Sequence, residues 1–487
     1  MLPDLFLLPS DCLIMKPNSR VNTFIFLFLF NTLLSYTQHV VVRGTGEGYA
    51  GVPVTVSLRS DPVTGKQITL FIVNCNENGE FTTEIPLKGM EIVYLKAGIA
   101  NFTLLAAEGH EYNLRLSPYQ PVPEEYENNP FFTGKTIIPE VVNDTSDINN
   151  LIRRYDAVYN TVFNRVADRV AKKISIEEIP SLISRLNSFI ASTSDQFFND
   201  FVTFRLIMLN AAAWGEYPGR REDSILINRI FVPENPAYTD LIEMLYRDSF
   251  RQLMTGPFKN EFLRALNISS PAAIMKVLEH EGKVVNPELQ QYIILLNSYY
   301  GYHNGLFEEK MVCALLDSLA FGGKTGYIRK LASVLKSDIT ALIPGSVPPY
   351  FELPDSTGRK ISPGEFAGKY LLLVFIKSTD YHALSELTLL KSWAGKYSSD
   401  MIPVAVLAGK NFSEMLSFFR QRGFDWIFLD GSGSPFLVAN YDIKLWPAFF
   451  LLNREGKIAV KYCPAPSENL ESLISGIITR ESEQSGR

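Results

Sequence analysis

Cysteine is scarce in this sequence. The chain of 487 residues has four cysteines, Cys12, Cys75, Cys313 and Cys463, and none lies within a few residues of another. This spacing excludes a Cys-x-x-Cys motif and the closely spaced cysteine ligands of a zinc knuckle. We expect buried or incidental thiols. One structural disulfide would be compatible with an oxidising compartment, but the sequence leaves its pair open among Cys75, Cys313 and Cys463.

Clustered charge is also scarce. Charged residues make up 20% of the chain, the formal net charge is −6, and no lysine- or arginine-rich run occurs. A nucleic-acid partner would need a clustered basic face, so none is expected. The pair His280-Glu281 begins an HExxH pattern, yet Val284 stands where its second histidine would be. We therefore predict neither a metal site nor a cofactor.

Only one apolar run approaches the length of a membrane span, and it lies near the N-terminus. Residues 24–35, FIFLFLFNTLLS, have the length of the hydrophobic region of a signal peptide and follow Lys16 and Arg20. A membrane span usually needs about 20 apolar residues. We expect a signal peptide over 1–37, with Met15 as an alternative start, and a soluble mature chain in an exported, periplasmic compartment. A retained N-terminal membrane anchor is the other interpretation.

Three patterns follow one another after this segment. Residues 38–118 contain short runs rich in β-branched and aromatic residues, separated by turn residues about every 8–12 positions, which predicts an antiparallel β-sandwich. Residues 119–145 are rich in proline and carboxylates and are predicted to be a linker. Residues 146–342 have apolar residues at intervals of three and four, which predicts an all-α domain.

Strands and helices alternate in the last part of the chain and end with two strands and a helix. This order predicts a βαβ unit joined to a hairpin, and hence a mixed sheet with helices on both faces. The expected strands are 371–376, 402–408, 426–430, 447–453 and 457–463, and the expected helices are 382–396, 411–422 and 467–479.

Two motifs in this part carry a family resemblance. PYFELPDSTGRKISPGEFAGKYLLLVF (349–375) and LWPAFFLLNREGKIAV (445–460) resemble the thioredoxin-like domain of exported TlpA/ResA-type proteins of Bacteroidetes type. The resemblance implies an α/β thioredoxin-like fold over 343–487. It also implies that Pro447 is the proline that is usually cis in this family. The members of the family are thiol-disulfide oxidoreductases.

The chemistry of that family depends on two cysteines at the start of a helix. The first is exposed at the helix N-terminus, where the dipole favours the thiolate, and the second resolves the mixed disulfide. Alignment of the strand end at residues 374–375 places Asp380 and Ala383 at these positions. Because no cysteine occurs between Cys313 and Cys463, dithiol chemistry is expected to be absent here.

Other residues at this junction have two interpretations. Asp380 is expected to cap the helix, with Ser378 or Thr379 as the alternative caps, because metal binding or acid-base catalysis with His382 would need further partners. Tyr381, His382, Trp446 and Pro447 are the candidates for a surface that binds a protein or peptide.

The preferred prediction is therefore an exported, non-catalytic binding or scaffolding protein with no membrane span in its mature chain. The alternative is a thiol-disulfide oxidoreductase that acts through Cys75, Cys313 or Cys463. A third interpretation is a receptor for a small ligand centred on the helices of 146–342.

Overall fold

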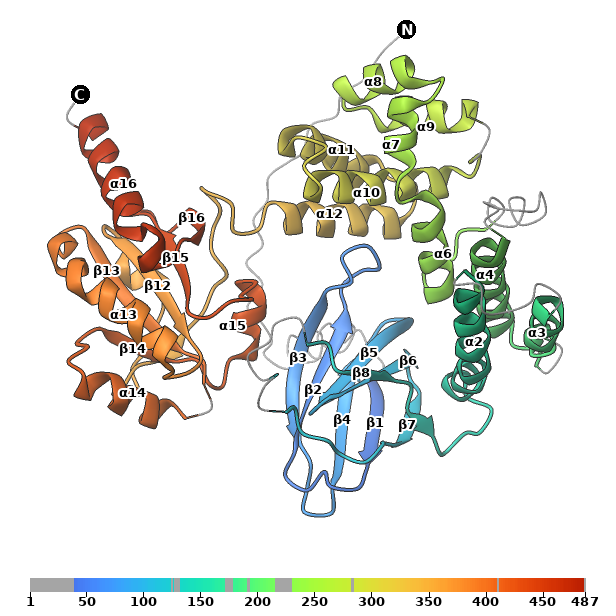
Figure 1. Ribbon diagram of the computed structural model, residues 1–487, viewed down its shortest axis with the longest axis horizontal. Helices are drawn as coiled ribbons and strands as arrows, with labels where there is room; N and C mark the ends of the chain where they lie inside the picture. The colour runs from blue at the N-terminus through green and yellow to red at the C-terminus, as the bar shows by residue number, and fades with distance from the viewer. Residues whose placement is uncertain are drawn as a thin grey trace, which may run out of the picture.

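The computed structural model describes residues 39–123, 126, 132–170, 178–190, 193–214, 230–281, 284–409 and 411–485. The expected signal peptide lies outside the described residues. Figure 1 shows three parts: a group of strands in blue, a group of helices in green to olive, and a mixed α/β part in orange to red. Among the described residues, no helix is both long and apolar enough to cross a bilayer.

Two sheets that share one hydrophobic core form the first part, called the sandwich (39–141). Their strand orders are β4-β1-β7-β9 and β3-β2-β5-β6-β8. Alternate side chains such as Val40 and Val42 of one sheet and Phe102 and Leu104 of the other enter the core, with the period of two that strands require. The strands are β1 (His39–Thr45), β2 (Pro53–Arg59), β3 (Gln67–Asn74), β4 (Glu80–Pro86), β5 (Met90–Ala97), β6 (Ala100–Ala107), β7 (Glu111–Arg115), β8 (Lys135–Ile137) and β9 (Glu140–Val141).

The sandwich differs from its prediction in two respects. Strands β1 and β7 run parallel, as do β6 and β8, so the sheets are mixed instead of wholly antiparallel. Strands β8 and β9 also lie within 119–145, which the sequence predicted to be a linker, and they pair with β6 and β7. Runs of two or three residues are too short to show an alternating pattern among prolines and carboxylates.

Helices make up the second part, called the helical block (148–339). Tyr155, Tyr159, Val162 and Val166 lie in its core at the spacing of three and four that the sequence predicted. The helices are α2 (Ile148–Val170), α3 (Glu178–Asn187), α4 (Gln196–Trp214), α6 (Pro236–Tyr246), α7 (Ser249–Thr255), α8 (Lys259–Asn267), α9 (Pro271–His280), α10 (Pro287–His303), α11 (Glu309–Gly322) and α12 (Gly326–Ile339).

Buried polar contacts join the sandwich to the helical block. Val63, at the tip of the β2–β3 loop, is 3% exposed within the helical core, and the Tyr300 hydroxyl donates to its carbonyl at 3.2 Å. On β6, the Leu105 N–H donates to Asn149 Oδ1 at 2.8 Å, and Asn149 Nδ2 donates to the Leu105 carbonyl at 3.0 Å. The amide of Asn149 thus satisfies the strand as a neighbouring strand would.

The third part, called the α/β domain (353–485), is built on the sheet β14-β13-β12-β15-β16. Strands β12, β13 and β14 are parallel, whereas β15 runs antiparallel to both β12 and β16. Its strands are β10 (Leu353–Pro354), β11 (Lys360–Ile361), β12 (Tyr370–Ile376), β13 (Met401–Leu407), β14 (Ile427–Asp430), β15 (Ala448–Leu452) and β16 (Ile458–Cys463). Its helices are α13 (Tyr381–Ala394), α14 (Phe412–Gln421), α15 (Pro435–Asn440) and α16 (Leu470–Ser485).

Both faces of this sheet are covered. Leu372 and Val374 of β12 belong to a core shared with α13, α14 and α16, whereas Leu373 and Phe375 belong to a core shared with α15 and the β10–β11 hairpin. All seven residues of β12 are buried, which explains its unbroken apolar run. The predicted mixed sheet with helices on both faces is confirmed. The short elements β10, β11 and α15 were not predicted.

Candidate functional site

The candidate site lies where β12 ends and β15 begins. Phe375 pairs with Ala448, so Pro447 lies beside the end of β12, and α13 starts just beyond this end. The peptide bond between Trp446 and Pro447 is cis, as the resemblance implied. The two predicted halves of the binding surface therefore meet at the same end of the sheet.

Asp380 is the N-cap of α13. Its Oδ1 accepts a hydrogen bond from the Ala383 N–H at 2.8 Å, and its Oδ2 accepts one from the Ser378 hydroxyl at 2.6 Å. The hydrogen bond from Ala383, and after it the one from Ser378, hold the pKa of Asp380 below its usual value, because they stabilise the carboxylate. Both carboxylate oxygens are thus engaged, and the geometry is that of a structural cap.

Ala383 faces inward. Its side chain is 4% exposed and packs in the same core as Leu387 and Val374. The position three residues after the helix cap is therefore part of the core of the α/β domain. A partner molecule at the surface would not touch it directly.

The candidate binding residues lie at the surface to different degrees. Tyr381 is 86% exposed and His382 is exposed, whereas Trp446 is half-buried against the core that contains Phe375. Leu445 is 71% exposed and was missed by the sequence prediction, because a single leucine in a loop belongs to no periodic pattern. Exposed aromatic and aliphatic side chains thus lie both at the start of α13 and in the cis-proline loop. Tyr381, His382, Trp446 and Pro447 are called the junction surface below.

A buried carboxylate in α13 was also missed. Glu386 is 5% exposed, and it accepts hydrogen bonds from the Ser467 N–H at 3.0 Å and the Ser467 hydroxyl at 2.7 Å. It therefore ties α13 to the segment that precedes α16. A signal existed, since Glu386 stands at a core-facing position between Ala383 and Leu390.

The described cysteines are poorly suited to thiol chemistry. Cys75, Cys313 and Cys463 are all free thiols, and they lie in the sandwich, the helical block and the α/β domain, respectively. Burial raises the pKa of each thiol, in Cys463 to about 12. Because the thiolate is the reactive form, these environments disfavour attack on a disulfide at neutral pH.

Comparisons with known proteins give structural matches only. No protein-family model matches the chain, and no curated protein matches it. A thiol-disulfide oxidoreductase from Bacteroides fragilis is 23% identical, over 27% of this chain and 99% of that chain, with a TM-score of 0.25. The thioredoxin domain of a thiol-disulfide oxidoreductase from Bacteroides vulgatus is 20% identical, over 28% of this chain and 98% of that chain, with a TM-score of 0.25. A thioredoxin-like protein from Bacteroides caccae is 15% identical, over 48% of this chain and 92% of that chain, with a TM-score of 0.30.

Proposed function

We propose that this chain is an exported binding protein whose α/β domain recognises a protein or peptide through the junction surface and does not catalyse dithiol exchange. The observation that carries the proposal is the hydrogen bond from the Ala383 N–H to the carboxylate of Asp380 at 2.8 Å. A helix cap and a buried methyl group occupy the two positions at which the resembling family has its cysteines.

The exposure of Tyr381 and Leu445 supports a binding role. Aromatic side chains on a rigid element are frequent anchors of protein interfaces, because they bury a large area with few rotatable bonds. Trp446 is held partly in the core, so its ring would be fixed before a partner arrives, and Tyr381 stands on the first turn of a capped helix, so its backbone position would be fixed as well. Such preorganisation lowers the entropy cost of binding.

A reduction assay tests the absence of dithiol catalysis. The mature chain is expected to reduce insulin no faster than dithiothreitol alone, and faster turnover would contradict the proposal. The double variant Asp380→Cys/Ala383→Cys should gain activity, because its first thiol would lie at the N-terminus of α13. The matched control Asp380→Ser/Ala383→Ser has side chains of similar size and no thiol, and it should stay inactive.

A peptide-display experiment tests the binding surface. A random peptide library selected on the wild-type chain should yield sequences that bind it, and Tyr381→Ala should weaken them at least about tenfold if Tyr381 is an anchor. The control Phe321→Ala removes an aromatic ring that is 94% exposed on α11, and it should leave binding unchanged. Equal loss in both variants, or none in Tyr381→Ala and Trp446→Ala, would refute the assignment.

Export follows from the proposed signal peptide over 1–37 and has its own test. N-terminal sequencing of the chain recovered from the periplasm should begin at Gln38. A chain that begins at Met1 or Met15 and sediments with membranes would support the retained anchor instead.

A further inference from the structure

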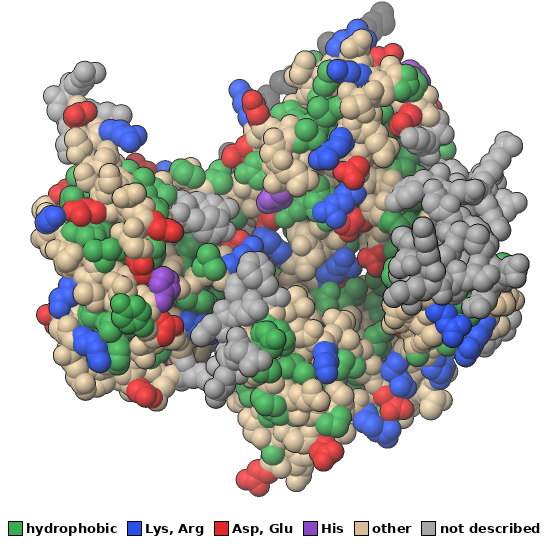
Figure 2. Space-filling view, in the orientation of Figure 1, with side chains coloured by type: hydrophobic (Ala, Val, Ile, Leu, Met, Phe, Trp, Pro, Cys, Tyr) green, Lys and Arg blue, Asp and Glu red, His purple; other side chains and the backbone are tan. Residues whose placement is uncertain are grey.

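A cavity lies between the sandwich and the helical block, away from the junction surface. Its volume is about 300 Å³, and its walls come from the β2–β3 loop, the start of β5, α6 and α12. In Figure 2, basic and acidic side chains lie where the sandwich and the helical block meet. The charged residues that line the cavity are Arg59, Lys88, Lys330, Asp61, Glu91 and Glu234.

Two of these charged groups fix the wall. The Asp61 carboxylate accepts hydrogen bonds from the Val63 N–H at 2.8 Å and the Thr64 N–H at 2.7 Å, and Arg59 Nη2 donates to the Pro62 carbonyl at 3.1 Å. Because Val63 is buried in the helical core, this loop is anchored at its tip. This wall of the cavity is therefore held in place by contacts of the chain itself, as the walls of binding pockets usually are.

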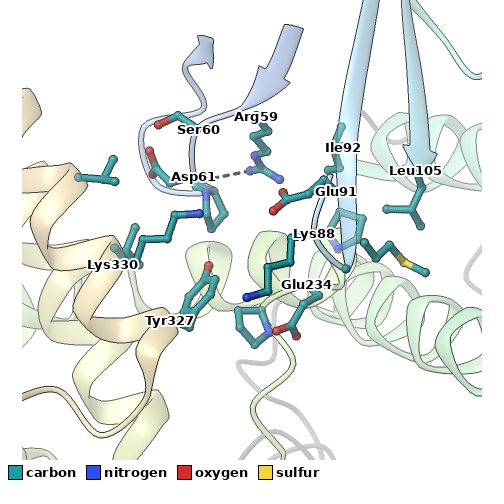
Figure 3. Close-up of a pocket in the computed structure, with 17 residues that line it drawn as sticks. Arg59, Ser60, Asp61, Lys88, Glu91, Ile92, Leu105, Glu234, Tyr327 and Lys330 are labelled. Atoms are coloured by element: carbon teal, nitrogen blue, oxygen red, sulfur yellow. Dashed lines mark hydrogen bonds between the residues drawn. The ribbon is translucent and has the colours of Figure 1, made fainter. Parts of the chain in front are cut away.

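The other four charged groups have no partner in the described part of the chain. The side chains of Lys88, Lys330, Glu91 and Glu234 make no hydrogen bond or ion pair there. Figure 3 shows Arg59 and Glu91 directed from the sandwich, and Lys330 and Tyr327 directed from α12, toward one space. Charges of both signs thus converge without neutralising one another by contact.

Tyr327 supplies a further unmet polar group. Its hydroxyl is buried without a hydrogen-bond partner among the described residues. Burial raises the pKa of the phenol, and the carboxylates of Asp61 and Glu234 raise it further, so the group remains a donor at neutral pH. Since buried hydroxyl groups are normally hydrogen-bonded, an acceptor on a ligand would complete this one.

The remaining wall is apolar and includes Ile92, Leu105, Leu331 and Val334. The three cations of the lining balance its three carboxylates, so the cavity has no excess charge to attract a simple anion or cation. An apolar wall with separate positive and negative groups is instead complementary to a neutral molecule that carries both charges.

We propose that this cavity binds a small zwitterion with an apolar side chain, that is, an amino acid or dipeptide. Its carboxylate would contact Lys330, Lys88 and the hydroxyl of Tyr327, and its ammonium group would contact Glu91 and Glu234. Its side chain would lie on the apolar wall. This inference is independent of the junction surface, because the two sites share no residue.

Calorimetry with the mature chain and the dipeptide Leu-Leu tests the proposal without any variant. The dissociation constant of Leu-Leu should be about 1 mM or lower, within the range of weak specific ligands. N-acetyl-Leu-Leu, which lacks the ammonium group, and Leu-Leu amide, which lacks the carboxylate, should each bind at least about tenfold more weakly, equivalent to about 1.4 kcal/mol. Binding of inorganic phosphate instead of Leu-Leu would overturn the proposal, as would equal affinity for the blocked peptides.

Two variants then assign the ends of the ligand. Glu91→Gln should bind Leu-Leu at least about tenfold more weakly than wild type does, and it should bind N-acetyl-Leu-Leu no worse than wild type does. Lys330→Met should also bind Leu-Leu at least about tenfold more weakly, and it should bind Leu-Leu amide no worse than wild type does. The matched controls Glu84→Gln and Lys310→Met change exposed charges outside the cavity and should leave affinity unchanged. Circular dichroism verifies that each variant is folded. Folded Glu91 and Lys330 variants with wild-type affinity would overturn the assignment, as would an absence of Leu-Leu binding by the wild-type chain.

Discussion

Replacement of Asp380 by alanine is expected to loosen the first turn of α13. The change removes the acceptor that lies 2.8 Å from the Ala383 N–H, and no acidic residue in the first turn can replace the lost charge. Loss of an N-cap of this type costs about 0.5–2 kcal/mol. The effect should be local, because Asp380 touches the end of one helix.

Local hydrogen exchange is the suitable assay, since a chain with several parts does not unfold in one transition. A cost of about 0.5–2 kcal/mol corresponds to exchange about 2- to 30-fold faster at the amides of residues 381–384, at tenfold per 1.4 kcal/mol. The control Asp355→Ala removes a carboxylate that holds a turn beside β10, and it should leave these amides unchanged. Unchanged exchange in Asp380→Ala would refute the capping argument.

The dependence on pH gives the same argument a second test. The pKa of Asp380 is lowered in the folded chain from its usual value of 3.8. Its charge therefore contributes stability above pH 3.8, and this contribution is lost as the pH falls through the lower folded value. The difference between wild type and Asp380→Ala should shrink in that range. Asp380→Asn keeps an acceptor oxygen but does not titrate, so its difference from Asp380→Ala should not shrink as the pH falls. If the difference in exchange between wild type and Asp380→Ala stayed constant with pH, the charge of Asp380 would be excluded as the source of that difference.

Two further predictions concern buried polar contacts. Asn149→Leu leaves the N–H and the carbonyl of Leu105 unpaired, at a cost of about 1–3 kcal/mol for each group. Hydrogen exchange at the Leu105 amide should become faster, whereas the exposed Asn160→Leu on the same helix should leave it unchanged; similar exchange in the two variants would contradict the role of Asn149. Glu386→Ala removes both hydrogen bonds to Ser467, and a loss of about 1.5–3 kcal/mol per hydrogen bond to a charged group should speed proteolysis before α16. Unchanged cleavage there would show that Glu386 does not hold this segment.

The α/β domain could be predicted from the sequence because its signals are local. Strand β12 is an uninterrupted apolar run, and the helix expected at 382–396 is found as α13, Tyr381–Ala394. The family resemblance carried by the motif around Pro447 also implied the cis peptide bond. In contrast, β8 and β9 depend on partners far away in the sequence, and runs of two or three residues carry no period of their own.

The residues of the candidate sites could likewise be predicted where their signal is local and could not where their partners are distant in the sequence. Asp380 was predictable, since a helix cap is a relation between residues three positions apart. Glu386 could have been suspected as a carboxylate on an apolar helix face, but its partner Ser467 follows only from the fold. The cavity could not have been predicted. Its residues come from five separate stretches of the chain, and the lack of partners around Glu91 or Lys330 has no local signature.

The short strands β8 and β9 have a consequence for dividing this chain. Each covers the outer strand of a sheet, β6 in one case and β7 in the other. A fragment that stops at Pro118 would leave both edges with unpaired backbone groups, which invite pairing with another copy. It would also lack Asn149, the partner of Leu105. The sandwich is thus completed by residues that lead into α2, and the smallest autonomous piece should extend from His39 into the helical block.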